Sequence, residues 1–587
     1  MGLPTTRPSP RQNREADPTP SAALVTHRQG VAPLAALSSA AMLWASFPPL
    51  DWWPLAWVAL VPLLLLIGAQ PRPKLLYPWV YLGGLAFWLA AIQWMRLGDA
   101  TMYVGWIALS IYLACYLPAF VWLTRVAVDR LHLPLEWSAA VVWTGLELAR
   151  AHVMSGFAWY YLGHTQYPWI TLIQVSDLVG AYGVSFLVVL VAGCGVALLG
   201  EREVQDRPVA RFRPRLVLPG VVLFAVLVYG WVRQGQAEFR LGPKVALLQG
   251  NIAQDAKLDP GENQRVFRHY FELMETAALA KPDLIVWPET MFRSPLVSID
   301  PAVTDDDLRR HFPEAAPEFV TEDLRVLERD VPEGLTYLAR HSGTAVLIGI
   351  DAHDVSTSGV RRYNSTVLVT DAGIRGRYDK VHRVPFGEFL PLANTLPWLV
   401  HLTPFPEGYG IDAGSEAVRF ELDGYHFATI ICFEDTVPHL VRRVLNEARP
   451  AVYPPADAAP SNTSGDSLPP LDFLVNQTND GWFHGSSELD QHLITGAFRS
   501  VECRIPTVRA VNTGISAVID GNGRFVRRAH DPATGKSKQV AAVLVEAVPL
   551  DDRASLYVRF GDWFAGLCLL ACGGLAVGSL ALPAPSV

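Results

Sequence analysis

Three reactive side chains in this sequence each follow a run of residues that is typical of a strand. They are Glu289 after the run 284–287, Lys380 after residues 377–379, and Cys432 after the run 426–431. In α/β proteins, ligands gather at the carboxyl ends of strands, and carboxyl, amine and thiol groups are common participants in covalent catalysis. Each residue alone has a plainer interpretation, because a cysteine after a strand usually fills the core and a charged residue there usually lies on the surface.

The region that holds these residues, 243–550, has the pattern of an ordinary soluble α/β domain. Apolar runs predict strands at 245–249, 284–287, 345–350, 364–370, 425–431, 473–477 and 515–519, and helical spacing predicts helices at 263–279, 335–340, 437–447 and 488–501. Fully apolar strands that alternate with helices indicate a buried sheet. The run Asp-Gly-Asn-Gly at 520–523 predicts a hairpin, so we expect the sheet to be mixed.

Two segments of this domain are expected to be exposed loops. Residues 291–330 carry an acidic cluster, which favours a solvated surface insertion, and residues 448–470 are rich in Pro, Ser, Ala and Asp. Either segment is long enough to form a lid over a site.

The composition of the whole chain favours a membrane protein. Half of the 587 residues are hydrophobic, only 18% are charged, and the mean hydropathy is +0.22. These values exclude a disordered chain, a coiled coil and a collagen. The net charge of −8 gives no reason to expect a nucleic acid partner. Six cysteines without a Cys-x-x-Cys pair predict neither a disulfide framework nor a zinc or redox centre, so no metal or cofactor is expected.

Eight hydrophobic stretches predict a bundle of about eight transmembrane helices. They fall at 31–47, 53–69, 77–95, 103–124, 135–149, 174–200, 215–233 and 561–582. A bilayer core needs about 20 apolar residues per helix, so the first, second and fifth stretches are short. The alternative for the first stretch is a cleaved signal peptide; a retained helix is favoured because the stretch is long and more helices follow.

Basic residues indicate how these helices are oriented. With a cytoplasmic N-terminus, arginines and lysines gather in alternate loops, and the opposite short loops hold only Arg96 and Arg150. This positive-inside bias places the α/β domain outside the cytoplasm. The predicted organisation is a disordered cytoplasmic N-terminus at 1–30, a transmembrane bundle at 31–235, the α/β domain at 243–550 and a last helix at 561–582.

Local motifs around the three reactive residues resemble those of the carbon–nitrogen hydrolase (nitrilase) superfamily, whose catalytic residues occur in the order Glu, Lys, Cys. The similar motifs are Trp287-Pro288-Glu289, Lys380 upstream of Pro385-Phe386-Gly387-Glu388, Cys432-Phe433-Glu434 and Asn479-Asp480-Gly481-Trp482-Phe483. With seven helices before the domain and one after it, the chain closely resembles the bacterial apolipoprotein N-acyltransferases. Two departures are Leu258, where that family often has Trp, and Phe433, where Tyr is more usual.

The resemblance implies an α-β-β-α nitrilase-like sandwich and a two-step acyl transfer. Cys432 would take an acyl group from a phospholipid as a thioester and pass it to the N-terminal amine of an S-diacylglyceryl-apolipoprotein, the last step of lipoprotein maturation. Glu289 would be the general base, and Lys380 would stabilise the oxyanion together with a backbone N–H after Cys432.

Supporting roles follow from the same resemblance. Glu388 would position Lys380 or the incoming amine, with a purely structural role as the alternative. Phe433 and Glu434 would support the site. Trp159, in the aromatic loop 156–162, would line a lipid entrance, although aromatic residues are also expected there as an interfacial belt. The expected protein is a monomeric, multi-pass inner-membrane acyltransferase with its catalytic domain in the periplasm.

Two rival functions remain open at this stage. A membrane-tethered amidase would use the same three residues but resolve the acyl-enzyme with water. A transporter or receptor that merely kept the fold would carry ionisable residues in mid-membrane, where Glu147 is the main one. The second cysteine of the soluble domain, Cys503, is expected to be core packing. Cys115, Cys194, Cys568 and Cys572 lie in the hydrophobic stretches and are expected to be inert.

Overall fold

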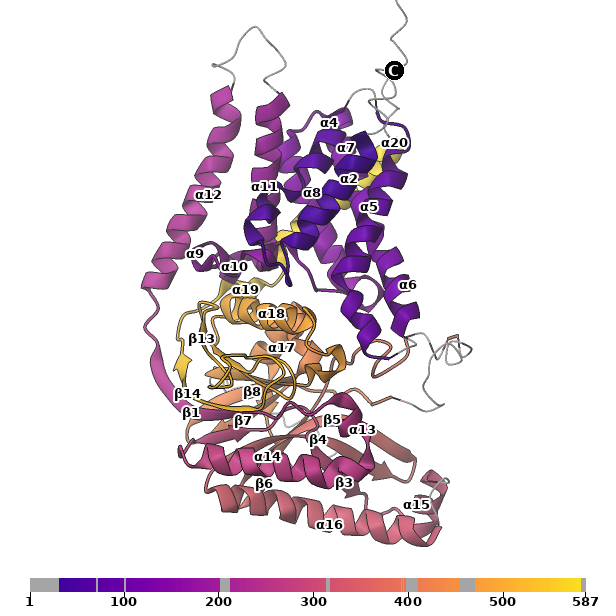
Figure 1. Cartoon of the computed structure of the whole chain (residues 1–587), viewed down its shortest axis with the longest axis vertical. Coiled ribbons are helices and arrows are strands. Elements are labelled where there is room, and N and C mark those ends of the chain that lie inside the picture. The colour runs from indigo at the N-terminus through magenta and orange to yellow at the C-terminus, as the bar shows by residue number, and fades with distance from the viewer. Residues whose placement is uncertain are drawn as a thin grey trace, which may run out of the picture.

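The computed structural model describes residues 31–69, 72–99, 102–200, 212–312, 317–391, 393, 395, 396, 398, 410–453 and 470–581. The predicted disorder of residues 1–30 and most of the predicted loop 448–470 lie outside these residues. A helical bundle stands on an α/β domain, and α18 lies at the junction between the two (Figure 1). The chain runs through the bundle, then through the α/β domain, and returns to the bundle with its last helix.

All eight hydrophobic stretches contain helices. These are α2 (Val31–Ala45), α3 (Ala56–Ala59) with α4 (Val61–Gly68), α5 (Leu76–Ala91), α6 (Met102–Ala114) with α7 (Tyr116–Arg125), α8 (Leu135–His152), α11 (Ala181–Gly200), α12 (Phe212–Gly235) and α20 (Trp563–Ala581). Among the described residues, four segments are long and apolar enough to cross a membrane: 102–130, 181–199, 216–235 and 563–580. The other stretches are shorter or carry ionisable residues, so eight spans remain a prediction.

The helix α8 is packed closely by α11 and α20. A Cβ atom on Gly145 of α8 would lie 2.7 Å from Cys572 Sγ, and one on Gly193 of α11 would lie 2.6 Å from the Cα of Glu136. Because only glycine leaves room at these positions, the three helix backbones approach each other as small residues allow in membrane bundles.

The α/β domain contains two facing seven-stranded sheets, counted over the described residues. The first has the order β14-β1-β2-β4-β5-β6, with β3 also paired to β4, and the second has the order β13-β12-β11-β10-β8-β7-β9. The strands of the first sheet are β1 (Arg240–Gln249), β2 (Leu284–Val286), β3 (Phe292–Ile299), β4 (Ala345–Ser356), β5 (Gly359–Thr370), β6 (Gly373–Asp379) and β14 (Ala542–Leu550). Those of the second are β7 (Val418–Leu422), β8 (Tyr425–Ile431), β9 (Arg449–Pro450), β10 (Phe473–Thr478), β11 (Thr507–Val511), β12 (Ala517–Ile519) and β13 (Phe525–Arg528).

The two sheets enclose one apolar core and are covered by helices on their outer faces. Val245 and Leu347 of the first sheet pack with Phe427 and Val475 of the second. The helices α14 (Asn263–Ala278) and α16 (Pro317–Ser342) cover the first sheet, and α17 (Pro438–Glu447) and α18 (Glu488–Cys503) cover the second. The four layers are therefore α-β-β-α, as the resemblance implied. Parallel β1-β2-β4 pairs beside antiparallel β4-β5 confirm a mixed arrangement, and the 520–523 hairpin joins β12 to β13.

The prediction that residues 291–330 form a loop is wrong. This segment contains β3, α15 (Asp305–His311) and the start of α16. Leu296 and Val297 are buried, and Thr304 and Asp307 cap the first turn of α15. The acidic residues do not mark a loop, because several of them serve as helix caps or as partners of arginines. The strands β7, β9, β11, β13 and β14 were also not predicted, and the predicted helix 335–340 is the end of the much longer α16.

Buried ion pairs fix the α/β domain on the bundle. Arg504, directly after α18, donates from Nε to Oδ2 of Asp177 in α10 (Ser176–Val179) over 2.8 Å. The same carboxylate pairs with Arg233 of α12 at 2.8 Å, and Glu502 of α18 accepts the backbone N–H of Ala181. The orientation of α18 is therefore set by the membrane helices.

Candidate active site

Cys432 stands at the carboxyl end of β8 in an unusual backbone conformation. Its φ is +53°, a left-handed conformation that is uncommon for a residue other than glycine and is often found at functional sites. The residue opens a short 3-10 helix, Cys432–Thr436, so the chain turns sharply directly after the strand. The neighbouring strand β10 ends at Thr478, whose hydroxyl donates to Asp480 Oδ1 over 2.9 Å.

The structure brings Glu289, Lys380 and Glu388 together next to this turn. Lys380 Nζ lies 2.7 Å from Glu388 Oε1 and 3.4 Å from Glu289 Oε1, and the lysine is fully buried. Asn364 Nδ2 donates to Glu289 Oε1 over 2.7 Å. Burial lowers the pKa of Lys380, but the carboxylates of Glu388 and Glu289 outweigh burial and raise it well above its ordinary value. The ammonium is therefore permanently charged at neutral pH.

The charges of Glu289 and Lys380 also act on the Cys432 thiol. Burial raises the pKa of Cys432 well above its ordinary value; the Glu289 carboxylate raises it further, and Lys380 acts in the opposite direction. The resting side chain is consequently a neutral thiol, which needs a base to become a nucleophile. Glu289 is the carboxylate whose charge acts most strongly on this thiol.

Glu434 is a structural clamp between the two catalytic segments. Its carboxylate accepts the hydroxyl of Tyr378 and the backbone N–H groups of Val381 and His382, with distances of 2.8–2.9 Å. It also accepts the N–H of Ile431 over 2.7 Å. One buried side chain thus ties the segment after β6, which carries Lys380, to the turn that carries Cys432.

A second buried lysine, Lys257 of α13 (Gln254–Leu258), lies on the other side of Glu289. Its Nζ donates to Thr290 Oγ1 over 2.5 Å and lies 3.5 Å from the backbone oxygen of Glu289. Burial lowers the pKa of Lys257, although Glu289 counteracts this. Sequence reasoning did not select Lys257, because a lysine in a short polar helix gives no signal of burial.

A buried network of charged residues lies behind the Cys432 turn, and sequence reasoning missed it as well. His492 of α18 approaches three carboxylates, with 2.9 Å to Asp435, 2.9 Å to Asp480 and 3.5 Å to Glu488. Arg509 of β11 bridges Asp435 and Asp480 with two contacts of 2.9 Å. Asp480, Glu488 and His492 are spaced like metal ligands, but Arg509 already neutralises Asp480, so an ion-pair network explains the grouping.

Comparisons with known proteins agree with this architecture. Residues 39–194 match the apolipoprotein N-acyltransferase N-terminal domain, and residues 244–556 match the carbon–nitrogen hydrolase family. The apolipoprotein N-acyltransferase of Geobacter metallireducens is 32% identical over 568 residues, which cover 94% of this chain and 96% of that protein. The chain belongs to the apolipoprotein N-acyltransferase family. It is accordingly an acyltransferase of the carbon–nitrogen hydrolase superfamily.

Two further similar proteins are another member of this family and a distant amidase. The apolipoprotein N-acyltransferase of Rhodopirellula baltica is 33% identical, with 91% of this chain and 95% of that protein covered. The solved structure of a mutant amidase from Nesterenkonia sp. AN1 is 13% identical, covers 55% of this chain and 94% of its own, and has a TM-score of 0.35. At that level the likeness says nothing about the activity of this chain.

Aromatic side chains connect the catalytic turn of this acyltransferase to its membrane bundle. Phe433 stacks on His382 with ring centroids 5.8 Å apart, and both Phe433 and Phe483 pack against the apolar core of the bundle. Trp94 contacts Phe483 at 4.8 Å and Trp159 at 5.4 Å. Trp159 in turn contacts the ring of His492 at 5.4 Å, so the loop 156–162 reaches the catalytic domain. It is buried there, not exposed at a membrane surface.

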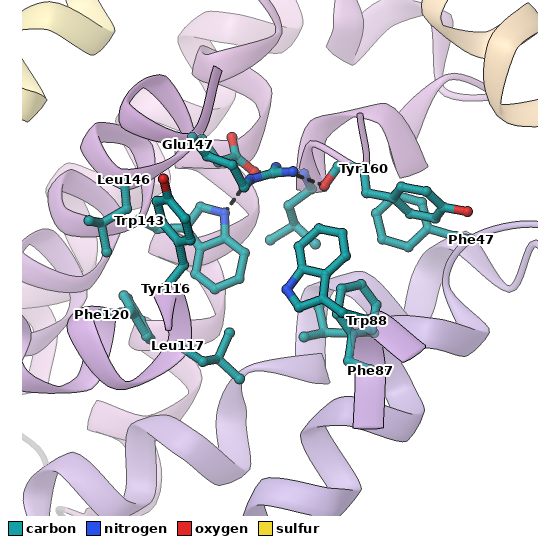
Figure 2. Close-up of a pocket in the computed structure, with 13 residues that line it drawn as sticks. Phe47, Phe87, Trp88, Tyr116, Leu117, Phe120, Trp143, Leu146, Glu147 and Tyr160 are labelled. Atoms are coloured by element: carbon teal, nitrogen blue, oxygen red, sulfur yellow. Dashed lines mark hydrogen bonds between the residues drawn. The ribbon is translucent and has the colours of Figure 1, made fainter. Parts of the chain in front are cut away.

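An apolar cavity lies in the bundle beyond these aromatic residues (Figure 2). Tyr160, Trp88, Phe87 and Phe47 line one side of it, and Tyr116, Leu117, Phe120 and Trp143 line the other. Glu147 accepts the Trp143 Nε1–H and the Leu162 N–H, and Arg150 donates to the carbonyls of Trp159 and Tyr160. Glu147, the main ionisable residue of the hydrophobic stretches, is therefore engaged in holding the aromatic loop.

The remaining cysteines have no place in the site. All six cysteines lie in the described residues and are free. Cys503 is buried among Val441, Val444 and Leu474 on the outer face of the second sheet, which confirms that it packs in the core. Cys115 is exposed at the junction of α6 and α7, and Cys194, Cys568 and Cys572 lie in α11 and α20.

Proposed function

We propose that this protein transfers an acyl chain from a phospholipid to the N-terminal amine of S-diacylglyceryl-cysteine in apolipoproteins. A thioester on Cys432 is the intermediate. The observation that carries the proposal is that a cluster of half-buried Cys432 with buried Glu289 and Lys380 is joined by aromatic contacts to a cavity in a membrane bundle.

The first half-reaction forms the thioester. Glu289 takes the thiol proton, and the Cys432 sulfur attacks the carbonyl carbon of the phospholipid ester. Lys380 and the backbone N–H of Phe433 stabilise the oxyanion of the tetrahedral intermediate. When the C–O bond to the glycerol breaks, protonated Glu289 returns its proton to the leaving oxygen, and a lysophospholipid departs.

The second half-reaction forms the amide. The neutral α-amine of the acceptor attacks the thioester carbonyl, and Glu289 accepts one of its protons. Collapse of the intermediate breaks the C–S bond, and Glu289 reprotonates the sulfur. The enzyme returns to its starting state, and the acceptor carries a new amide. Glu388 keeps Lys380 in place through both steps, since it holds the ammonium at 2.7 Å.

The acyl chain needs an apolar place during both steps. We propose that it passes Phe433, Phe483 and Trp159 and enters the bundle at the cavity lined by Phe87, Trp88 and Phe120. The cavity has a volume of about 40 Å³, so the lining side chains must move apart to admit a chain. Trp159 is then an entrance residue, because it lies between His492 of the catalytic domain and Trp94 of the bundle.

Intact-mass measurement of the purified protein with phospholipid and no acceptor tests the function. We expect one acyl group on Cys432, released by neutral hydroxylamine and discharged by a diacylglyceryl-cysteine peptide whose N-terminus becomes amide-linked. A peptide with an acetylated N-terminus serves as the matched control and should leave the thioester intact. The tethered amidase predicts the opposite result: free fatty acid accumulates without peptide, and the peptide changes nothing.

We further propose that the protein spans the inner membrane with its catalytic domain in the periplasm, on the basis of the arginine bias in the sequence. Reporter fusions after residue 131, between α7 and α8, should report cytoplasm, and fusions after residue 371, between β5 and β6, should report periplasm. The reverse pattern would overturn this localisation and the lipoprotein substrate with it.

A further inference from the structure

The backbone carbonyl of Cys432 is held by a buried histidine. His492 Nε2 lies 3.3 Å from the backbone oxygen of Cys432. His492 is almost fully buried and stands on α18, which the membrane helices orient through Arg504 and Glu502. The contact thus joins the nucleophile's own peptide group to a rigid element.

The peptide group that carries this carbonyl also carries the N–H of Phe433. In a trans peptide, the C=O of one residue and the N–H of the next are coplanar and point in opposite directions. A donor that fixes the direction of the Cys432 carbonyl therefore fixes the direction of the Phe433 N–H. That N–H is the backbone group to which the proposed mechanism assigns part of the oxyanion stabilisation.

The surroundings of His492 keep it a hydrogen-bond donor on both ring nitrogens. Nδ1 lies 2.9 Å from Asp480 Oδ1, and Nε2 lies 2.9 Å from Asp435 Oδ1 as well as close to the Cys432 carbonyl. Arg509 and Asn476 hold the other oxygen of Asp435 at 2.9 and 2.6 Å. A cationic donor polarises the peptide bond it contacts, and this strengthens the N–H at the other end of the same group.

We propose that His492 is a positioning residue for the oxyanion site: it holds and polarises the Cys432–Phe433 peptide so that the Phe433 N–H points at the developing oxyanion. The inference rests on the proposed acylation of Cys432. It assigns a role in the reaction to the buried Asp435–Asp480–Arg509 network, which keeps His492 in place without touching the substrate.

Two substitutions of His492 separate this role from a merely structural one. In H492Q the amide nitrogen falls at the position of Nε2 and can still donate to the Cys432 carbonyl. In H492N the amide nitrogen falls at the position of Nδ1 and can reach only Asp480. Both variants remove the positive charge, so they differ mainly in the contact to the Cys432 peptide. His269, which bonds the backbone oxygen of Gly250 at 2.9 Å far along the chain from Cys432, gives the matched control H269Q.

Two rates at Cys432 are measured for each variant, with the modified peptide located by mass. Acylation by phospholipid vesicles needs an oxyanion site, whereas alkylation by iodoacetamide is a displacement that forms no oxyanion. Alkylation is followed over a range of pH, so that the rates of the thiolate forms are compared. We expect H492N to lower the acylation rate about 100-fold, the usual effect of losing one oxyanion donor, and to leave alkylation near the wild-type rate. H492Q should recover much of the acylation rate, and H269Q should match the wild type in both.

Equal acylation rates for H492Q and H492N, or a parallel fall of acylation and alkylation, would overturn the positioning role. A wild-type protein that alkylates at Cys432 but never gains an acyl group would overturn the proposed function instead.

Discussion

Lys380 Nζ lies 2.7 Å from Glu388 Oε1, and the same glutamate accepts the N–H of Val384 through its other oxygen. The ion pair closes a loop of nine residues, 380–388, whose two ends meet at the active site. The ammonium also lies 3.4 Å from Glu289 Oε1, so Glu388 is the nearer of its two carboxylate partners. Glu388 and Glu289 thus have different surroundings, although their side chains are chemically identical. Glu388 holds Lys380 and the Val384 N–H, whereas we propose that Glu289 is the base.

The contact between Glu388 and Lys380 predicts that E388Q lowers the rate of thioester formation less than K380A does. K380A should lower the rate of thioester formation by about 100- to 1000-fold, since an oxyanion donor is lost. E388Q should lower it by about 10-fold, because the charge-assisted bond to Lys380 is weakened while the Val384 contact persists. Rapid-quench intact mass measures both rates, with the exposed E333Q of α16 as control. If E388Q lowered the rate of discharge by the acceptor peptide more than the rate of thioester formation, Glu388 would also contact the incoming amine.

The clamp made by Glu434 predicts coupled losses of stability and activity. E434Q should lower the free energy of unfolding by about 3 kcal/mol, because buried backbone N–H groups then face an amide NH₂ instead of a carboxylate. Y378F, which removes one donor to the same carboxylate, should cost about 1 kcal/mol. Thermal unfolding and thioester formation are measured on the same preparations. If E434Q were as stable as the wild type, the clamp would be unnecessary for the fold.

The charged network behind Cys432 predicts a stability that falls at alkaline pH. Burial and Arg509 lower the pKa of His492, but the carboxylates of Asp435 and Asp480 outweigh them and raise it to about 10 from its ordinary 6.5. The His492 ring also faces the carboxylate of Glu488 at 3.5 Å and the backbone oxygen of Cys432 at 3.3 Å. A raised pKa stabilises the folded protein fully below the unfolded value, and this stabilisation is lost as the pH rises through the folded value.

The melting temperature of the solubilised wild type should therefore decline between about pH 6.5 and about pH 10. The difference in melting temperature between the wild type and H492Q should shrink over the same window, because the histidine becomes neutral as well. A difference that stays constant across this window would show that His492 is not charged in the folded protein.

The cavity in the bundle predicts a limit on chain length. L117W would place an indole in the lining between Phe120 and Tyr116, so the thioester should form with shorter acyl chains than in the wild type. A mixture of phospholipids with different chain lengths, followed by intact mass of the acyl-enzyme, measures the selection. V104W on α6 replaces an exposed residue and is the control, since its indole would face outward. Unchanged chain selection in L117W would place the acyl chain elsewhere.

The sequence by itself determined which residues are candidates for the site and where the chain is apolar. Lys380 follows the polar residues 377–379 and was selected from the order Glu, Lys, Cys and from the motif at 385–388. Glu289 and Cys432 were selected because each follows an apolar run, and burial of a strand is a property of adjacent residues. The eight hydrophobic stretches and seven of the fourteen described strands of the sandwich were predictable for the same reason. The 291–330 segment was not, because its acidic residues hid short buried stretches such as Leu296 and Val297.

Only the tertiary structure decided what surrounds those residues. His492, Asp480 and Arg509 are neighbours because β8 pairs with β10, β10 pairs with β11, and α18 covers this sheet. Lys257 likewise contacts Thr290, 33 residues further along the chain, and Glu434 contacts Val381, 53 residues before it. Local patterns report the periodicity of burial along the chain. They carry no information about which charged side chains meet once the strands pair, because that depends on register between distant segments.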